Sequence, residues 1–182
     1  MEKKEKNVWN PVLEFLIYMV VVLALTFLIV TFVGQRTMVS GDSMYPMLED
    51  EDQLLVDKLS YRFTDPERYD IVVFRYLFRA NTFYIKRIIG LPGETVQIID
   101  GAVYINGERL GETYGYEPML DAKRASQPIT LGPDEYFVLG DNRNDSSDSR
   151  DPAVGNVLRS QLVGKAFVRI WPFEKIGFIR HQ

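Results

Sequence analysis

The sequence predicts a mostly β protein, in which an antiparallel β-rich domain follows one N-terminal transmembrane helix. Two observations support this fold class. Residues 15–33 form a run of nineteen residues without a formally charged side chain. From Gln53 onward, short β-branched and aromatic segments alternate with turn residues, which is typical of strands. At 182 residues, the chain has room for that helix and about one domain of usual size.

The apolar run is predicted to be a membrane anchor. As a helix it would span roughly 28 Å, close to the hydrocarbon thickness of a bilayer. A cleaved signal peptide is the alternative, but its apolar region is usually about 7–15 residues long and ends in a small-x-small cleavage site. Three lysines precede the run and Arg36 follows it. We therefore expect the N-terminus in the cytoplasm and the remaining chain outside.

These patterns divide the chain into a cytoplasmic tail (1–14), a transmembrane anchor (15–34) and an extracytoplasmic domain (35–182). Within the domain, the pattern of a strand occurs at residues 53–56, 71–74, 82–89, 95–99, 102–105, 136–139 and 163–170. Asp100 and Gly101 separate two of these segments and predict a two-residue hairpin turn. Residues 111–128 lack periodicity, which predicts an exposed insertion.

Ser43 lies in a stretch, residues 41–47, that predicts an irregular loop. Gly41 tolerates backbone angles closed to other residues, and Pro46 fixes its own φ, so neither a helix nor a central strand fits. Most serines in such loops are ordinary turn residues, because the hydroxyl suits local backbone hydrogen bonds. A nucleophilic Ser43 would need an activating base.

The composition leaves a lysine as the candidate base. The chain has no cysteine and one histidine, so we expect neither a metal site nor another cofactor. His181 is second from the last residue, where chains fray, which disfavours a Ser-His-Asp arrangement. A lysine accepts a proton near neutral pH only when it is desolvated, so the base should lie among apolar residues.

Lys86 meets that requirement. Side chains in residues 82–89 alternate between two faces, and most neighbours on both faces are apolar. A strand that is apolar on both sides is typically buried, and Lys86 between Tyr84 and Ile88 would lose much of its hydration. The alternative is a lysine whose stem packs on the sheet while its ammonium reaches water. Arg87, on the other face, would need a carboxylate partner if that face is covered.

Residues 140–150 are all polar or glycine. Such a run is commonly a solvated loop. Its composition also permits a compact network beside the lysine. The network would pair Asp141 with Arg87 or Arg143, pair Asp148 with Arg150, and let Ser146 donate to a neutral Lys86.

Together these stretches resemble the bacterial type I signal peptidases, which are membrane-anchored Ser-Lys proteases. The resemblance rests on five segments in the family's order: Gly41-Asp42-Ser43-Met44-Tyr45-Pro46, residues 52–58, residues 69–74, residues 84–94, and Gly140-Asp141-Asn142-Arg143 with residues 146–150. It implies a β-rich catalytic domain with Ser43 as nucleophile, Lys86 as general base and Ser146 as the hydroxyl that orients the lysine. It also implies a structural salt-bridge network of Asp141, Arg143, Asp148 and Arg150, which Arg87 would join.

The resemblance further implies the partners and the location. Its substrates would be secretory preproteins, cut after small residues at the first and third positions before the scissile bond. The protein would act as a monomer in the cell membrane, in contact with the lipid bilayer. Nucleic acid is not an expected partner, because the net charge is −4 and the basic residues are interleaved with acids.

Departures from the family's pattern leave other functions open. Met47 stands where many members have threonine. Gly41 stands where some have the serine that helps stabilise the oxyanion, so the Ser43 backbone N–H is the expected donor, with Gly41 lending space. Residues 151–155 also depart from the pattern. One alternative is an inactive membrane-tethered domain that binds peptides; another is a different Ser-Lys hydrolase, such as a relative of the self-cleaving SOS repressors, which lack an anchor.

Overall fold

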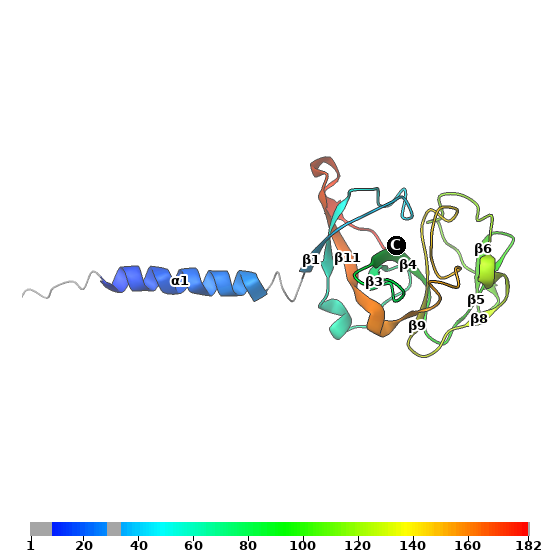
Figure 1. Cartoon of the computed structure of the whole chain (residues 1–182), viewed down its shortest axis with the longest axis horizontal. Coiled ribbons are helices and arrows are strands. Elements are labelled where there is room, and N and C mark those ends of the chain that lie inside the picture. The colour runs from blue at the N-terminus through cyan, green and yellow to red at the C-terminus, as the bar shows by residue number, and fades with distance from the viewer. Residues whose placement is uncertain (1–8, 29–33, 182) are drawn as a thin grey trace, which may run out of the picture.

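The structure is a computed structural model that describes residues 9–28 and 34–181. The helix α1 (Trp9–Leu28) stands apart from a domain built of β-strands (Figure 1). The predicted apolar segment begins within α1, and its residues 29–33 lie outside the described part. Within the described ranges, no helix combines the length and apolar character that crossing a membrane requires.

The strands form two antiparallel sheets. The eight-stranded sheet has the order β1-β2-β11-β3-β4-β9-β10, with β12 paired to β11, and the four-stranded sheet has the order β7-β6-β5-β8. The smaller sheet lies at the end of the domain far from α1 (Figure 1). Their bounds are β1 (Gly34–Met38), β2 (Gln53–Asp57), β3 (Ile71–Arg75), β4 (Phe83–Gly90), β5 (Thr95–Ile99), β6 (Ala102–Ile105), β7 (Glu108–Arg109), β8 (Ile129–Thr130), β9 (Glu135–Leu139), β10 (Val157–Leu158), β11 (Leu162–Trp171) and β12 (Gly177–Phe178).

The predicted antiparallel β architecture is confirmed. Every predicted strand is present, with each end within one residue of its predicted position. Asp100 and Gly101 have φ values of 49° and 75°, as a two-residue turn between β5 and β6 requires. The sequence reading missed β1 and four strands of two residues each, namely β7, β8, β10 and β12. Two residues are too few to show the alternation of apolar and polar side chains by which a strand is recognised in a sequence.

The segment 111–128 is only partly the exposed insertion that its sequence predicts. Most of its side chains are exposed, but Met119 and Ala125 are buried in a core cluster with Val96 and Phe137. One short 3-10 helix, Lys123–Ser126, lies within it. The segment is therefore tied to the smaller sheet.

Strand β4 is covered on both faces, as its sequence predicts. Ile88 packs with Val72 and Phe74 in one cluster, whereas Ile85 and Ile89 pack in two others. Its neighbours in the larger sheet are β3 and β9. Burying each such side chain stabilises the fold by about 1.5–3 kcal/mol, so β4 is a rigid platform for the residues that it carries.

Candidate active site

The loop that follows β1 presents Ser43. Gly41 has a φ of 83°, and its N–H donates to Asp50 Oδ1 at 2.7 Å, which holds the turn before the serine. Met44 and Leu48 are fully buried, and they anchor the chain after it. The predicted irregular loop is confirmed. Ser43 is half-buried, and the Gly41 hydrogen bond before it and the buried Met44 after it hold its backbone in place.

Lys86 lies directly against this serine. Its Nζ is 2.6 Å from Ser43 Oγ and 2.9 Å from the carbonyl oxygen of Ile85. The residue is 4% exposed. Burial lowers the pKa of Lys86 to about 8, although the carboxylates of Asp148 and Asp141 act in the opposite direction. The snorkelling alternative is therefore wrong, because the amine is enclosed and not in water.

A cavity of about 220 Å³ opens onto the two reactive groups. Its walls come from the end of β1 with the residues after it, from β3 and β4, and from the loop 140–150. The lining residues are Thr37, Met38, Val39, Ser40, Ser43, Val73, Phe83, Tyr84, Ile85, Lys86 and Ser147.

The loop 140–150 forms two of the predicted ion pairs. Arg87 binds Asp141 through two hydrogen bonds of 2.8 and 2.7 Å, with both side chains at most 2% exposed. Asp148 binds Arg150 through contacts of 2.9 Å. Removing one member of such a buried pair strongly destabilises the folded protein, because the charge of the other member stays buried without a partner.

Of the two predicted partners of Asp141, the structure has Arg87 and not Arg143. The Arg143 Nε donates to the Gly140 carbonyl oxygen at 3.0 Å, and its guanidinium binds Glu112, in the segment 111–128, through two hydrogen bonds of 2.7 Å. Asp141 already has both carboxylate oxygens on Arg87, and Glu112 is the only carboxylate that pairs with Arg143 among the described residues. The segment 111–128 is thus part of the network.

The predicted hydrogen bond from Ser146 to Lys86 is not made. Ser146 Oγ is buried and has no partner among the described residues. It lies beside Gly140, where an added Cβ would collide with both Ser146 Oγ and the carbonyl oxygen of Ser43. The Lys86 amine is instead held by Ser43 and the Ile85 carbonyl.

The backbone hydrogen bonds around Ser43 show which N–H and carbonyl groups have a partner among the described residues. The Ser43 carbonyl accepts the N–H of Asn142 at 3.1 Å, which joins the serine loop to the loop 140–150. The Ser43 N–H donates to no acceptor in the described ranges. The Gly41 N–H is engaged by Asp50, so Gly41 contributes space and not a donor.

His181 is ordered, contrary to the prediction that it frays. Its Nδ1 accepts the N–H of Ile71 at 3.1 Å, and its carbonyl accepts bonds from Tyr114 (3.1 Å) and Arg87 (3.4 Å). Burial, helped by the nearby Lys165, lowers the pKa of His181 to about 4, so its imidazole is neutral. It makes no contact with Ser43, which agrees with its exclusion as the base.

Sequence reasoning missed the contribution of residues 112–116. Glu112 binds Arg143, the Tyr114 ring lies 3.9 Å from the Arg87 guanidinium carbon, and the Tyr116 ring packs edge-on against Tyr45. No periodic pattern in residues 111–128 indicated these contacts.

The arrangement places a hydroxyl against a desolvated amine, which is the pairing that activation of a serine nucleophile requires. Among the described residues, no group of three or more His, Asp or Glu side chains could hold a metal ion.

Comparisons with known proteins agree with this class of site. The family described as "Signal peptidase, peptidase S26" matches residues 12–171. A probable signal peptidase I-2 from Synechocystis sp. is 42% identical over 98% of this chain and 82% of its own length. The signal peptidase I P of Bacillus subtilis subsp. natto is 34% identical over 97% and 98%, respectively. A crystal structure of a signal peptidase I from Enterococcus faecalis V583 is 36% identical with a TM-score of 0.48, and the match covers 56% of this chain and 97% of that one.

The chain therefore belongs to the signal peptidase family, peptidase S26. It is an enzyme, a serine protease of the signal peptidase I type.

The buried pair beneath the site predicts a large stability effect. Asp141→Asn should destabilise the protein by about 3–5 kcal/mol, because Arg87 stays charged and buried. Glu49→Gln is the control, because it removes an exposed ion pair. The side chains of Glu49 and Lys175 are 43% and 42% exposed, so this variant should leave the urea midpoint of unfolding unchanged. Urea unfolding measures both midpoints, and equal midpoints for the two variants would contradict the prediction.

Proposed function

We propose that the protein is a membrane-bound endopeptidase that removes signal peptides from exported preproteins. Ser43 is the nucleophile and Lys86 the general base. The observation that carries the proposal is the 2.6 Å contact between Lys86 Nζ and Ser43 Oγ, with the amine 4% exposed. A domain that only binds peptides needs neither group. One chain supplies both, so we infer that it acts as a monomer.

The reaction follows from this geometry. The neutral Lys86 amine takes the proton of Ser43 Oγ as that oxygen attacks the peptide carbonyl. The Ser43 N–H is placed to stabilise the oxyanion that forms. As the carbon–nitrogen bond breaks, the Lys86 ammonium gives its proton to the leaving amine. The neutral Lys86 then deprotonates a water, which hydrolyses the ester on Ser43 and releases the serine hydroxyl.

The strands beside the cavity favour an extended substrate. β4 pairs with β3 along residues 83–87, but with β9 only from Arg87 onward. β1 lies at the edge of the sheet order. An extended peptide can therefore add hydrogen bonds to free strand edges while alternate side chains enter the cavity. Two alternate side chains share this cavity of about 220 Å³, which favours small residues at the first and third positions before the cut.

A secretory precursor tests this function. The purified full chain should cut a precursor with alanine at both positions, and Ser43→Ala should reduce the rate at least about a thousandfold. Precursors with Phe or Lys at either position should resist cutting, because one cavity holds both side chains and no carboxylate among the described residues lines it to pair with a lysine. Gel analysis and mass spectrometry of the products locate the cut. Efficient cutting of both substituted precursors would refute the pocket assignment.

Variants of Lys86 test the base. Lys86→Arg keeps the charge, but a guanidinium does not deprotonate in this range, so its activity should fall as far as that of Lys86→Met. A loss of about a hundredfold or more is expected in both. In the wild type, kcat/KM should rise with pH along a limb centred near 8, because only the neutral amine is a base. An unchanged limb in Lys86→Arg would rule this assignment out.

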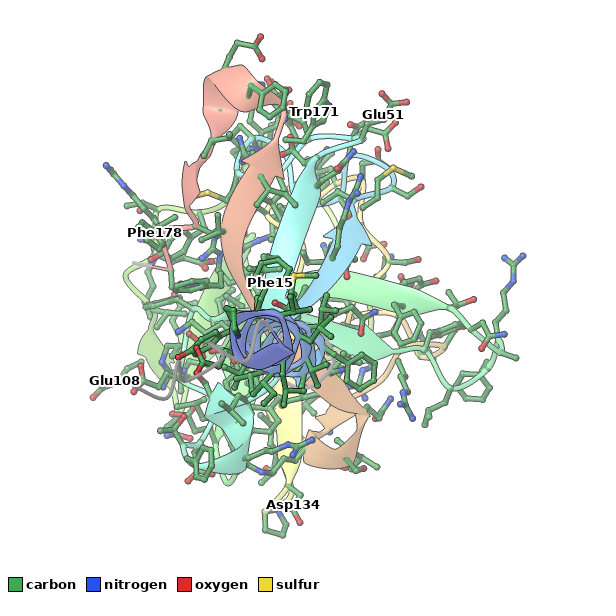
Figure 2. The ribbon with its side chains drawn as sticks, turned by 90° about the vertical axis from the view of Figure 1, so that its left-hand side faces the viewer. Phe15, Glu51, Glu108, Asp134, Trp171 and Phe178 are labelled. Atoms are coloured by element: carbon green, nitrogen blue, oxygen red, sulfur yellow. The ribbon has the colours of Figure 1, made fainter. Side chains whose placement is uncertain are left out.

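We also propose that the protein is held in the cell membrane, with its N-terminus in the cytoplasm and the catalytic domain outside. The support is the uncharged run at residues 15–33 and the lysines before it. Exposed aromatic side chains add to it: Trp171, Phe173 and Phe178 are 42%, 68% and 75% exposed. Figure 2 is a view from the side of α1, and there Trp171 and Phe178 point outward.

Vesicle sedimentation tests the aromatic contact. Residues 36–182 alone should sediment with phosphatidylcholine vesicles, since exposed rings suit the bilayer interface. The double variant Trp171→Ala/Phe178→Ala should sediment less. Leu120→Ala removes an equally apolar, 85% exposed side chain outside this aromatic set and is the control. Equal sedimentation of all three proteins would show that these rings do not bind the membrane.

A further inference from the structure

Residues 112–116 lie against the loop 140–150 and β4. Glu112 accepts both hydrogen bonds of Arg143, Tyr114 covers the Arg87 guanidinium, and the Tyr116 N–H donates to the carbonyl oxygen of Asp141 at 3.0 Å. These three contacts hold the segment in place beside the elements that carry Lys86 and contact Ser43.

The segment is held firmly at both ends. Before Tyr116, Arg143 and Glu112 pair with side chains only 3% and 12% exposed. After it, Met119 is buried, and the N–H of Leu120 donates to Asn144 Oδ1 at 3.0 Å. Because these anchors lie on both sides, the backbone of Tyr116 is fixed relative to the loop that contacts Ser43.

The Tyr116 ring meets the nucleophile loop directly. Its centroid is 4.9 Å from that of Tyr45, with the ring planes at 86°, which is a favourable edge-to-face contact. Tyr45 is two residues after Ser43. Tyr116 remains 50% exposed. The two tyrosines therefore present an aromatic surface beside the nucleophile.

This surface is separate from the cavity that opens onto Ser43 and Lys86. The cavity is lined by residues 37–40, before the serine, and by β3 and β4, and neither tyrosine contributes to it. A polypeptide cut at Ser43 extends in two directions from the scissile bond. If the part before the cut fills the cavity, the part after it leaves along another surface.

We propose that Tyr116, supported by Tyr45, binds the substrate residue that directly follows the scissile bond. This inference rests on the proposed peptidase function and adds a specificity-determining residue to it. An aromatic surface favours apolar and aromatic side chains, whereas the negative π-face disfavours a carboxylate. The enzyme should therefore select for the first residue of the released product as well as for the residues before the cut.

Precursor peptides that differ only in the residue after the cut, either Phe or Asp, test this inference on the full chain. The wild type should prefer Phe over Asp in kcat/KM by roughly two- to tenfold, the range that aromatic contacts supply. Tyr116→Ala should bring the ratio close to one, and Tyr116→Phe should retain it. Leu120→Ala, in the same segment, is the control and should match the wild type. The ratio compares two substrates on one variant, so it does not depend on the folded fraction.

The outcomes separate this inference from the function on which it rests. A wild type that cuts neither peptide overturns both. A wild type that cuts them, with the Phe-to-Asp ratio unchanged in Tyr116→Ala, overturns the role of Tyr116 alone. A loss of kcat/KM in Tyr116→Ala that is equal for both peptides also overturns the role of Tyr116 in specificity, because it indicates a structural role only.

Discussion

The burial of Lys86 beside Ser43 is the constraint on which the rest of this structure depends. A lysine amine in water is protonated at neutral pH and cannot take a proton from serine. Enclosure at 4% exposure lowers its pKa to about 8, which makes an appreciable neutral fraction available. Packing on both faces of β4 supplies this enclosure. The core around β4 is therefore also what lowers the pKa of the proposed base.

Burying β4 brings a second charge with it, because Arg87 follows Lys86 directly. Asp141 neutralises Arg87 with two hydrogen bonds, and the Tyr114 ring with the His181 carbonyl encloses the rest of the guanidinium. Asp148 and Arg150 balance each other nearby. The acids raise the pKa of Lys86, so pairing each of them with an arginine limits an effect that would otherwise oppose its proposed role as a base.

Local patterns made much of this predictable. The alternation in β4, the hairpin at Asp100-Gly101 and the loop at Ser43 depend on neighbouring residues, and all are present in the structure. Strands of two residues carry no period and form only because a distant partner exists. Two contacts join residues that are far apart in the sequence, which local patterns do not reveal. Arg143 binds Glu112, 31 residues away, and the Ile71 N–H donates to His181, 110 residues away. Ser146 lies close to Gly140, but its buried hydroxyl has no hydrogen-bond partner among the described residues, which the sequence did not predict.

Direct titration of Lys86 tests the central claim, that its amine is neutral in the working enzyme. NMR of the protein labelled with ¹⁵N at the lysine side chains would follow each Nζ, with Lys86 assigned from the signal lost in Lys86→Arg. The account predicts that Lys86 titrates near 8, well below the value of about 10.4 for a lysine in solution. A Lys86 signal that titrates at the solution value would contradict it.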